Sequence, residues 1–371
     1  MASRYFTNRK KIAMSRYLSP KQSSLVPYTP GEQPRERKYI KLNTNESPFP
    51  PSDKAIKAAA EAARKLNLYS DPTCKALTES IAALYGVDPA QIICTNGSDE
   101  VLDFAFQAFC DDKTPAVFPN ITYGFYPVFA ARNHVPYETI PLREDFTIDV
   151  TDYCGIGKTI FIANPNAPTG IALTVSEIEQ IVASNPNNVV VIDEAYVDFG
   201  AESCVKLTGK YDNLLVTQTF SKSRSMAGAR LGFGIGNAKL IADLHTIRYS
   251  TNPYNVNSMT MAAGVGVLSD EDYTRRNCQT VMENRAYTAA ELQKRGFEMT
   301  NSYANFLFIK HPTLDGGKLY EKLKEMGILV RHFTASRISD YNRITIGTKA
   351  EMDALIAAID QILKEDCVKV Q

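Results

Sequence analysis

Short apolar runs alternate with amphipathic stretches through the middle of the chain, from about residue 90 to residue 237. The runs are rich in β-branched and aromatic residues and lie at 92–94, 116–118, 159–163, 189–192, 214–217 and 231–235. This alternation predicts an α/β domain with a mainly parallel sheet flanked by helices. A ligand of such a sheet binds at the carboxyl ends of the strands, so we look for chemistry there.

The pattern changes beyond about residue 256. A long helical stretch is followed by apolar runs at 306–309, 328–333 and 343–346, and a helix is expected from 349 to about 364. This order predicts a second, smaller α+β domain. We expect three parts: an N-terminal arm with part of the small domain at 1–49, a large domain at 50–255 and a small C-terminal domain at 256–371.

A lysine follows the fifth of the expected strands, in the sequence Thr219-Phe220-Ser221-Lys222, and Arg230 lies eight residues further on. The lysine is an amine able to form a Schiff base, and its neighbours include hydroxyl and guanidinium groups that bind phosphate. Ser-Lys pairs are common, however, so a solvated surface lysine is the alternative.

An acidic residue, Asp193, ends the most apolar of these strands. A carboxylate at the end of a buried strand needs a cationic or donor partner. The ring nitrogen of a pyridine cofactor would be such a partner, and the carboxylate would keep that nitrogen protonated. The alternative is an aspartate that caps a turn.

Two further turns follow expected strands. Gly97-Ser98-Asp99-Glu100 opens a helix, whose free N–H groups could hold a phosphate; the alternative is that Ser98 only caps that helix. Residues 164–170 read Asn-Pro-Asn-Ala-Pro-Thr-Gly, a rigid turn whose amides could orient a phenolate oxygen. Tyr123 could stack on a flat ring, although an aromatic residue is more often part of a core.

The composition narrows the choice of partners. The chain of 371 residues carries 41 basic and 41 acidic residues, which argues against a nucleic-acid partner, and its apolar runs are too short to span a membrane. The scattered cysteines suggest buried thiols in a reducing, cytoplasmic location: Cys74, Cys94, Cys110, Cys154, Cys204, Cys278 and Cys367. Their spacing and that of the histidines suggest no metal site.

The first 31 residues contain no acidic residue and six basic ones: Arg4, Arg9, Lys10, Lys11, Arg16 and Lys21. Such a segment is similar to an organelle transit peptide, whereas a secretory signal is excluded because no apolar stretch follows the charges. We interpret it instead as an arm that packs on a partner subunit, since the residues directly after it have the pattern of a folded domain.

These turns lie on successive strand ends, in an order that would assemble a single cofactor pocket. The chain resembles the fold-type I pyridoxal-phosphate enzymes and, among them, the histidinol-phosphate aminotransferases. The resemblance extends from Leu-Asn-Thr-Asn-Glu at 42–46 through Tyr-Ser-Asp-Pro at 69–72 to Arg-Ile-Thr-Ile-Gly at 343–347. It implies a large domain with a mainly parallel sheet and a smaller α+β domain.

By this resemblance, Lys222 binds pyridoxal phosphate and carries the proton, and Asp193 pairs with the ring nitrogen. Tyr196 would donate to the ring oxygen, Tyr123 would cover the ring, and Tyr69 would reach the phosphate bound in the neighbouring subunit of a homodimer. The residues that match the phosphate-binding part of the site are Ser98, Asp99, Thr219, Ser221 and Arg230.

The resemblance also implies a substrate site. Arg343 matches the arginine that holds the carboxylate of the amino-acid partner, whereas Arg331 and Tyr28 match positions near the phosphate end of histidinol phosphate. Tyr254 would lie near the reacting group. The family commonly has an asparagine before Pro-Thr-Gly that donates to the ring oxygen, where this chain has an alanine at position 167. The donor would then be Asn166, Asn164 or no residue at all, and of these we expect Asn166 to take over that function.

The activity implied is an amino-group exchange between L-histidinol phosphate and 2-oxoglutarate, a step of histidine biosynthesis. Two alternatives on the same scaffold remain open at this point. One is an aromatic-amino-acid aminotransferase, since one arginine can accept either a phosphate or a carboxylate. The other is a pyridoxal-phosphate-dependent decarboxylase of a phosphorylated amino acid.

Overall fold

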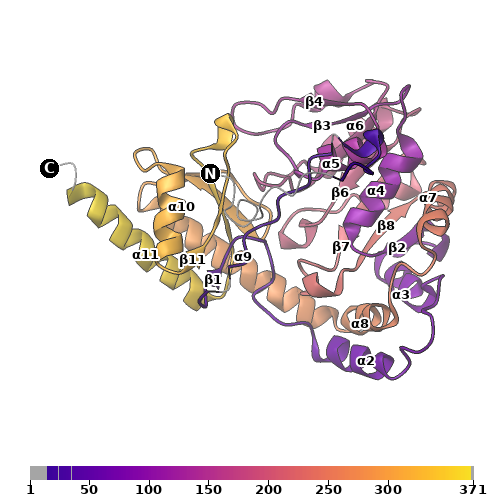
Figure 1. Cartoon of the computed structure of the whole chain (residues 1–371), viewed down its shortest axis with the longest axis horizontal. Coiled ribbons are helices and arrows are strands. Elements are labelled where there is room, and N and C mark those ends of the chain that lie inside the picture. The colour runs from indigo at the N-terminus through magenta and orange to yellow at the C-terminus, as the bar shows by residue number, and fades with distance from the viewer. Residues whose placement is uncertain (1–14, 24, 35, 369–371) are drawn as a thin grey trace.

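The computed structural model describes residues 15–23, 25–34 and 36–368. Within that part the chain forms two units, a large one around a seven-stranded sheet and a smaller one built from both ends of the chain (Figure 1). Most of the basic residues in the proposed N-terminal arm lie outside the described residues: Arg4, Arg9, Lys10 and Lys11.

The large sheet has the strand order β2-β8-β7-β6-β5-β3-β4. Strand β8 runs antiparallel to both of its neighbours, and the other neighbours are parallel. The strands are β2 (Ile92–Thr95), β3 (Ala116–Pro119), β4 (Tyr137–Ile140), β5 (Thr159–Ala163), β6 (Val190–Asp193), β7 (Leu214–Thr219) and β8 (Gly232–Gly236). The predicted mainly parallel sheet is therefore confirmed. Strand β4 was not predicted, because it is an exposed edge strand without an apolar run.

Helices cover both faces of this sheet. Ile162, Ile192 and Val216 belong to one buried cluster, and their neighbours Phe161 and Val191 belong to the cluster on the opposite face. A strand buried on both faces reads as a continuous apolar run, which is why these strands stood out in the sequence. The helices of this unit are α2 (Asp53–Ala63), α3 (Lys75–Tyr85), α4 (Ser98–Phe109), α5 (Tyr126–Asn133), α6 (Val175–Ser184), α7 (Ala238–Thr251) and α8 (Ser258–Leu268).

Helix α8 packs on α2 and α3 at the edge of the large unit. Its residues Ala263 and Val267 share a buried cluster with the large sheet, as does Val256 before it. This packing differs from the expected division at residue 256, which would have put α8 in the small domain. The expected division put α8 in the small domain because the sequence of this helix is apolar but does not indicate which neighbour the helix packs against.

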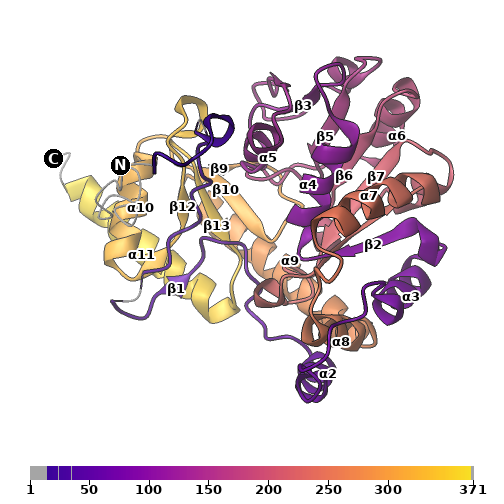
Figure 2. The same ribbon diagram turned by 45° about the vertical axis from the view of Figure 1, so that its right-hand side comes forward.

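The small unit contains β9 (Glu298–Met299), β10 (Phe306–Lys310), β12 (Arg331–His332) and β13 (Asn342–Thr345), in the order β12-β13-β10-β9. A parallel pair joins β1 (Ile40–Lys41) to β11 (Ile328–Leu329), so the N-terminal segment forms part of this unit before it continues to α2 (Figure 2). The helices are α9 (Glu271–Gln293), α10 (Gly316–Glu325) and α11 (Lys349–Val368).

The run at 328–333, expected to be one strand, is divided between two sheets. Residues 328–329 pair with β1, whereas Arg331 and His332 pair with β13. The division turns Arg331 toward the strand that carries Arg343. Short 3-10 helices complete the described chain: Pro20–Gln22, Pro89–Gln91, Val150–Tyr153, Val197–Phe199, Val205–Gly209, Ala227–Ala229 and Ser336–Ile338.

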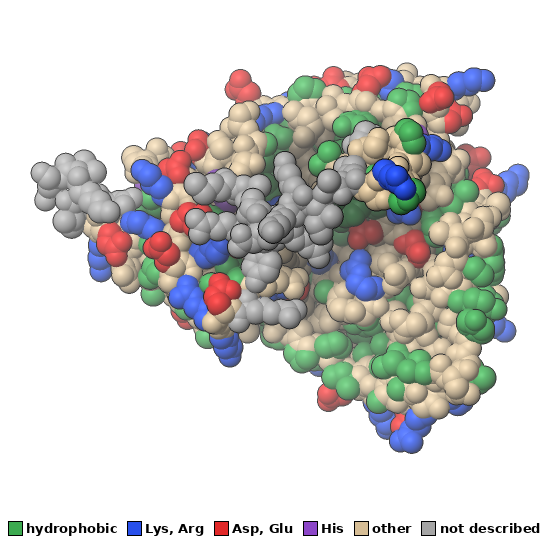
Figure 3. Space-filling model, viewed as in Figure 1, with side chains coloured by type: hydrophobic (Ala, Val, Ile, Leu, Met, Phe, Trp, Pro, Cys, Tyr) green, Lys and Arg blue, Asp and Glu red, His purple; other side chains and the backbone are tan. Residues whose placement is uncertain are grey.

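The surface carries both signs of charge, and basic and acidic side chains are interspersed over the face shown in Figure 3. Among the described residues, no helix is long and apolar enough to cross a membrane. The cysteines whose side chains are described are all free, and all except the half-buried Cys154 are buried.

Candidate active site

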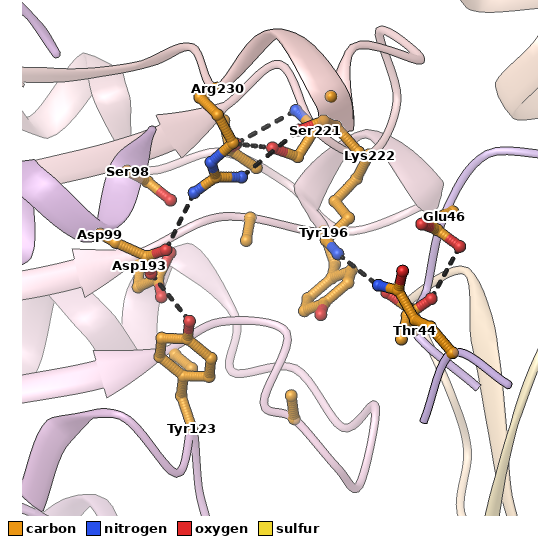
Figure 4. Close-up of a pocket in the computed structure, with 17 residues that line it drawn as sticks. Thr44, Glu46, Ser98, Asp99, Tyr123, Asp193, Tyr196, Ser221, Lys222 and Arg230 are labelled. Atoms are coloured by element: carbon orange, nitrogen blue, oxygen red, sulfur yellow. Dashed lines mark hydrogen bonds and ion pairs between the residues drawn. The ribbon is translucent and has the colours of Figure 1, made fainter. Parts of the chain in front are cut away.

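A cavity of about 400 Å³ lies at the carboxyl ends of the parallel strands. We call it the inner cavity (Figure 4). The structure brings most of the predicted cofactor-binding residues to its wall: Ser98, Asp99, Tyr123, Asp193, Tyr196, Thr219, Ser221, Lys222 and Arg230. They come from different strand ends and turns, and they meet because the carboxyl ends of parallel strands share one edge of a sheet.

Asp193 ends β6 and is buried at the base of the inner cavity. Its Oδ2 accepts a hydrogen bond from Tyr126 Oη at 3.3 Å, whereas its Oδ1 has no hydrogen-bond partner. Burial, together with the nearby charge of Asp99, raises the pKa of Asp193 to about 7. A buried carboxylate with an unpaired oxygen is suited to a cationic or donor group in the cavity.

The start of α4 and Arg230 form another part of the cavity wall. Arg230 Nη2 lies 3.1 Å from Asp99 Oδ2, and no side chain caps the helix. A Cβ on Gly97 would lie 2.6 Å from Arg230 Nη2, and one on Gly232 would lie 2.2 Å from the Ser98 nitrogen. Glycine at both positions therefore allows the guanidinium and β8 to approach the helix start, where the N–H groups favour an anion.

Lys222 projects into the cavity from a different side than Asp99 and Asp193 (Figure 4). Its Nζ donates to the backbone oxygen of Thr44 at 3.3 Å and lies 5.7 Å from the centre of the Tyr196 ring. In the described part of the chain, Lys222 forms no ion pair with a carboxylate. Its amine is half-buried and held only by one weak hydrogen bond, which leaves it available for reaction.

Thr44 and Glu46 also line the inner cavity, although sequence reasoning did not select them. Thr44 Oγ1 donates to Glu46 at 2.7 Å, and Lys41 Nζ donates to the same carboxylate at 2.8 Å. Burial opposes ionisation of Glu46, but these hydrogen bonds and the charge of Lys222 lower its pKa overall. The two residues lie in the motif at 42–46, which is one of the motifs that carry the family resemblance. That motif was the signal in the sequence that could have identified them.

The two tyrosines of the inner cavity are fixed by different partners. Tyr123 lies in the turn before α5, and its hydroxyl donates to Asp99 Oδ1 at 2.8 Å. Burial and the charge of Asp99 raise the pKa of Tyr123 well above its ordinary value. The hydroxyl of Tyr196 accepts a hydrogen bond from Asn45 Nδ2 at 3.0 Å. Asn45 was missed because its contact with Tyr196 spans 151 positions of the sequence.

A second cavity of about 450 Å³ adjoins the first one, and we call it the outer cavity. Tyr28, Arg331 and Arg343, predicted to bind the substrate, line it. The two cavities have part of their lining in common, namely Thr44, Tyr123, Ala167, Tyr196 and Lys222. A molecule in the outer cavity would therefore contact the same lysine as one in the inner cavity.

Two arginines face each other in the outer cavity. Arg331 and Arg343 are direct partners across β12 and β13, and neither forms an ion pair within the described ranges. Arg343 donates to the Asn43 backbone oxygen at 3.3 Å, while its Nε is buried and unpaired. Burial and the charge of Arg331 lower the pKa of Arg343. Facing like charges destabilise a sheet, so this arrangement favours an anionic ligand between them.

Three of the predicted site residues line neither cavity. Tyr69 is 84% exposed and stacks on Tyr254, with 4.6 Å between the ring centres. The side chain of Asn166 donates to the backbone oxygen of Ile121 and to Thr169, and accepts from Thr122 at 2.7 Å.

The polar atoms of Asn166 are thus occupied in holding its own turn. The expectation that Asn166 replaces the missing donor does not fit this geometry. Ala167 does line both cavities, so the position before Pro-Thr-Gly presents a methyl group where the family commonly has an amide.

The chain matches the family model for aminotransferase class I and II over residues 37–359. It is similar in fold to the histidinol-phosphate aminotransferase from Sinorhizobium meliloti, solved in complex with pyridoxal-5'-phosphate. That similarity has a TM-score of 0.85 at 22% identity and covers 95% of this chain and 99% of the other. The chain belongs to the class I and II aminotransferases, and the predicted fold-type I architecture is confirmed.

Relatives of known sequence define the family more closely. The histidinol-phosphate aminotransferase of Brachyspira hyodysenteriae is 49% identical over 353 residues, which cover 95% of this chain and all of the relative. The histidinol-phosphate aminotransferase 1 of Bordetella parapertussis is 48% identical over 353 residues, covering 94% of this chain and 99% of the relative. Within its class, the chain belongs to the histidinol-phosphate aminotransferase family, as the sequence resemblance implied.

Proposed function

We propose that this chain transfers the amino group of L-histidinol phosphate to 2-oxoglutarate, with pyridoxal phosphate bound to Lys222. One observation carries the proposal: a reactive lysine and a buried carboxylate with an unpaired oxygen face one cavity. Aminotransferase chemistry needs both groups, one to bind the cofactor and one to hold its ring nitrogen protonated.

The residues of the inner cavity fit this cofactor. The unpaired Oδ1 of Asp193 would accept a hydrogen bond from the protonated ring nitrogen, and the positive charge on that nitrogen would stabilise the carboxylate that burial alone disfavours. The start of α4, Thr219, Ser221 and Arg230 would hold the phosphate, because they supply donors and positive charge at the cavity wall. Tyr123 would cover one face of the ring.

When bound, pyridoxal phosphate supplies the aldehyde that accepts the amino group and a ring that withdraws electrons from the substrate carbon. The substrate amine would displace Lys222 Nζ from the cofactor, and the freed amine would then move the proton from that carbon to the carbon on the other side of the transferred nitrogen. Asp193 would keep the ring nitrogen protonated by accepting a hydrogen bond from it. Tyr196 would donate a hydrogen bond to the ring oxygen.

The outer cavity would bind the substrates. Arg343 would hold the carboxylate of glutamate or 2-oxoglutarate, and Arg331 with Tyr28 would contact the phosphate of histidinol phosphate. The support is a pair of guanidiniums that have no carboxylate partner among the described residues, in a cavity that Lys222 also lines, since a planar guanidinium binds either anion through two parallel hydrogen bonds. Both substrates can then use one site in turn.

We also propose that the active enzyme is a cytoplasmic homodimer. Tyr69 is mostly exposed and extends away from the cavities of its own chain, as a residue that serves a neighbouring subunit would. The ring of Tyr254 stacks on the ring of Tyr69, so Tyr254 would hold Tyr69 in position. Exposed apolar side chains nearby, Ile56, Leu66 and Leu68, would be buried in such a contact. The buried free thiols suit a reducing compartment.

A spectral half-reaction titration tests the proposed substrates. The purified enzyme is mixed with one amino donor at a time, and the visible band of the bound cofactor is followed. We expect histidinol phosphate to abolish the band at far lower concentrations than phenylalanine or tyrosine, and 2-oxoglutarate to restore it. A preference for the aromatic amino acids would contradict the proposed substrate. Carbon dioxide release from a phosphorylated amino acid without an oxo acid would indicate a decarboxylase instead.

A further inference from the structure

Asn45 lies where the N-terminal segment, the small unit and the active site meet. The residue is 1% exposed and adopts the left-handed backbone conformation with φ of 56°. Its backbone N–H donates to Thr345 Oγ1 at 2.9 Å, and its backbone oxygen accepts from Asn305 Nδ2 at 3.0 Å. Both partners belong to the small unit, so Asn45 is held firmly from that side.

The side chain of Asn45 connects this anchor to Tyr196. Thr345 Oγ1 donates to Asn45 Oδ1 at 3.0 Å, and Asn45 Nδ2 donates to Tyr196 Oη at 3.0 Å. Because the tyrosine oxygen accepts from Asn45, its own proton is directed elsewhere. Tyr196 lines both cavities, so its proton is available to a group bound there. A donor on the oxygen also makes the hydroxyl a stronger donor itself.

The hydrogen bond from Asn45 to Tyr196 matters more in this chain than it would in a chain with the family's asparagine before Pro-Thr-Gly. Position 167 carries a methyl group, Asn166 is occupied within its own turn, and Asn164 binds both backbone groups of Leu173. Of the donors considered for the ring oxygen, only Tyr196 lines the inner cavity in the described structure. The geometry of its hydroxyl then depends on Asn45.

We propose that Asn45 is a positioning residue that aims the Tyr196 proton at the cofactor's ring oxygen and thereby sets the pH at which the bound cofactor titrates. The inference rests on the proposed function, since it needs the cofactor on Lys222. Through Thr345, it also ties the strength of this hydrogen bond to the position of the small unit.

The test is a pH titration of the visible band in the cofactor-loaded enzyme. Asn45→Gly removes the side chain but tolerates the left-handed backbone. A hydrogen bond to the ring oxygen stabilises the deprotonated form of the bound cofactor, so weakening it should move the midpoint upward. We expect a rise of about 0.5 to 1 pH unit, the equivalent of one hydrogen bond. Asn45→Asp should raise the midpoint further, because a carboxylate would accept the tyrosine proton.

A double-variant comparison separates positioning from general disturbance. Tyr196→Phe should raise the midpoint by itself, and adding Asn45→Gly should then produce no further rise, because the effect passes through the missing hydroxyl. Thr345→Val should give a smaller rise than Asn45→Gly. Asn342→Ala is the matched control: it removes another buried asparagine of the small unit, bonded to the Gly316 backbone, and should leave the midpoint unchanged.

Ala167→Asn gives a complementary test, since it returns an amide to the cavity wall. We expect it to lower the midpoint and to reduce the effect of Asn45→Gly. The inference is overturned if Asn45→Gly leaves the midpoint in place while Tyr196→Phe moves it, or if the two effects add. Failure of the wild-type enzyme to carry the cofactor on Lys222, read from its mass after borohydride reduction, would instead overturn the proposed function.

Discussion

The inner and outer cavities share Lys222 and Tyr196, but they differ in how far their charged groups are paired with one another. In the inner cavity the charged groups largely satisfy one another, as in the pair of Arg230 with Asp99 and the hydrogen bond of Tyr123 to the same carboxylate. In the outer cavity, Arg331 and Arg343 face each other without an acidic partner among the described residues. Asp193 Oδ1 and the Lys222 amine, which has no carboxylate partner in the described part of the chain, are the exceptions in the inner cavity.

This difference fits a lasting occupant in one cavity and an exchanging occupant in the other. A permanently bound cofactor needs a few well-placed contacts, in a site whose other charged groups are already paired and held in place. A substrate that must leave again can be bound by mobile or unpaired cations that are costly to bury until an anion arrives. The following predictions test this contrast, from the largest expected effect to the smallest.

Replacing the shared lysine should remove the function of both cavities. Lys222→Ala should lower turnover by about 10⁴-fold or more, because it removes both the proton-transfer group and the attachment of the cofactor. The measurement is the rate of amino transfer together with the visible band of the cofactor, and both should be lost. Lys210→Ala, on the surface beside Glu179, should retain both.

Removing the exceptional carboxylate of the inner cavity should have the next largest effect. Asp193→Asn should lower kcat by about 10²- to 10³-fold, by analogy with the loss of other buried electrostatic groups in active sites. The variant should still bind the cofactor, since the phosphate contacts and Lys222 remain. A normal kcat in this variant would contradict the pairing of Asp193 with the ring nitrogen.

The raised pKa of Asp193 also predicts a pH dependence of stability in the cofactor-free enzyme. The folded protein holds this proton up to about pH 7, whereas the unfolded chain releases it near pH 4. Stability from this group is therefore present at low pH and is lost as the pH rises through 7. Thermal unfolding between pH 5 and 8 should show a fall in Tm for the wild type relative to Asp193→Asn. Equal slopes would show that Asp193 titrates normally.

Substitutions of the outer arginines should affect binding more than turnover. Arg331→Ala should raise the KM for histidinol phosphate by about 10- to 100-fold, because a hydrogen-bonded charge pair is lost. Arg343→Ala should raise the KM for 2-oxoglutarate by a similar factor. If instead each substitution altered both substrates equally and lowered kcat, the two arginines would belong to one fixed network, and the contrast between the cavities would fail.

The smallest direct effect is expected at Tyr69, which lines neither cavity of its own chain. Tyr69→Phe should weaken cofactor binding only about 3- to 10-fold, because one hydrogen bond is lost. Mixing Tyr69→Phe subunits with inactive Lys222→Ala subunits should restore one normal site in each mixed dimer. That site would show wild-type cofactor affinity. Continued weak binding in the mixture would show that Tyr69 does not serve the partner subunit.

Much of the inner cavity could be predicted from sequence because its residues follow strands that are buried on both faces. Asp193 ends β6 and Lys222 lies in the turn that follows β7, and strand order alone brings such positions to one edge. The start of α4 was recognised by its glycine and first-turn acids for the same local reason. The functions assigned to these residues came from the family resemblance. The order of the residues along the chain was part of that resemblance.

Only the tertiary structure decided the arrangements that join distant segments. The facing of Arg331 and Arg343 depends on a strand break at Val330, and the hydrogen bond of Asn45 to Tyr196 depends on how the N-terminal segment crosses the two units. The turning of Asn166 away from the cavities depends on its bonds to Ile121 and Thr122. Apolar periodicity and turn residues report the local conformation of the chain. They carry no information on which side chains from different segments of the chain share a hydrogen bond.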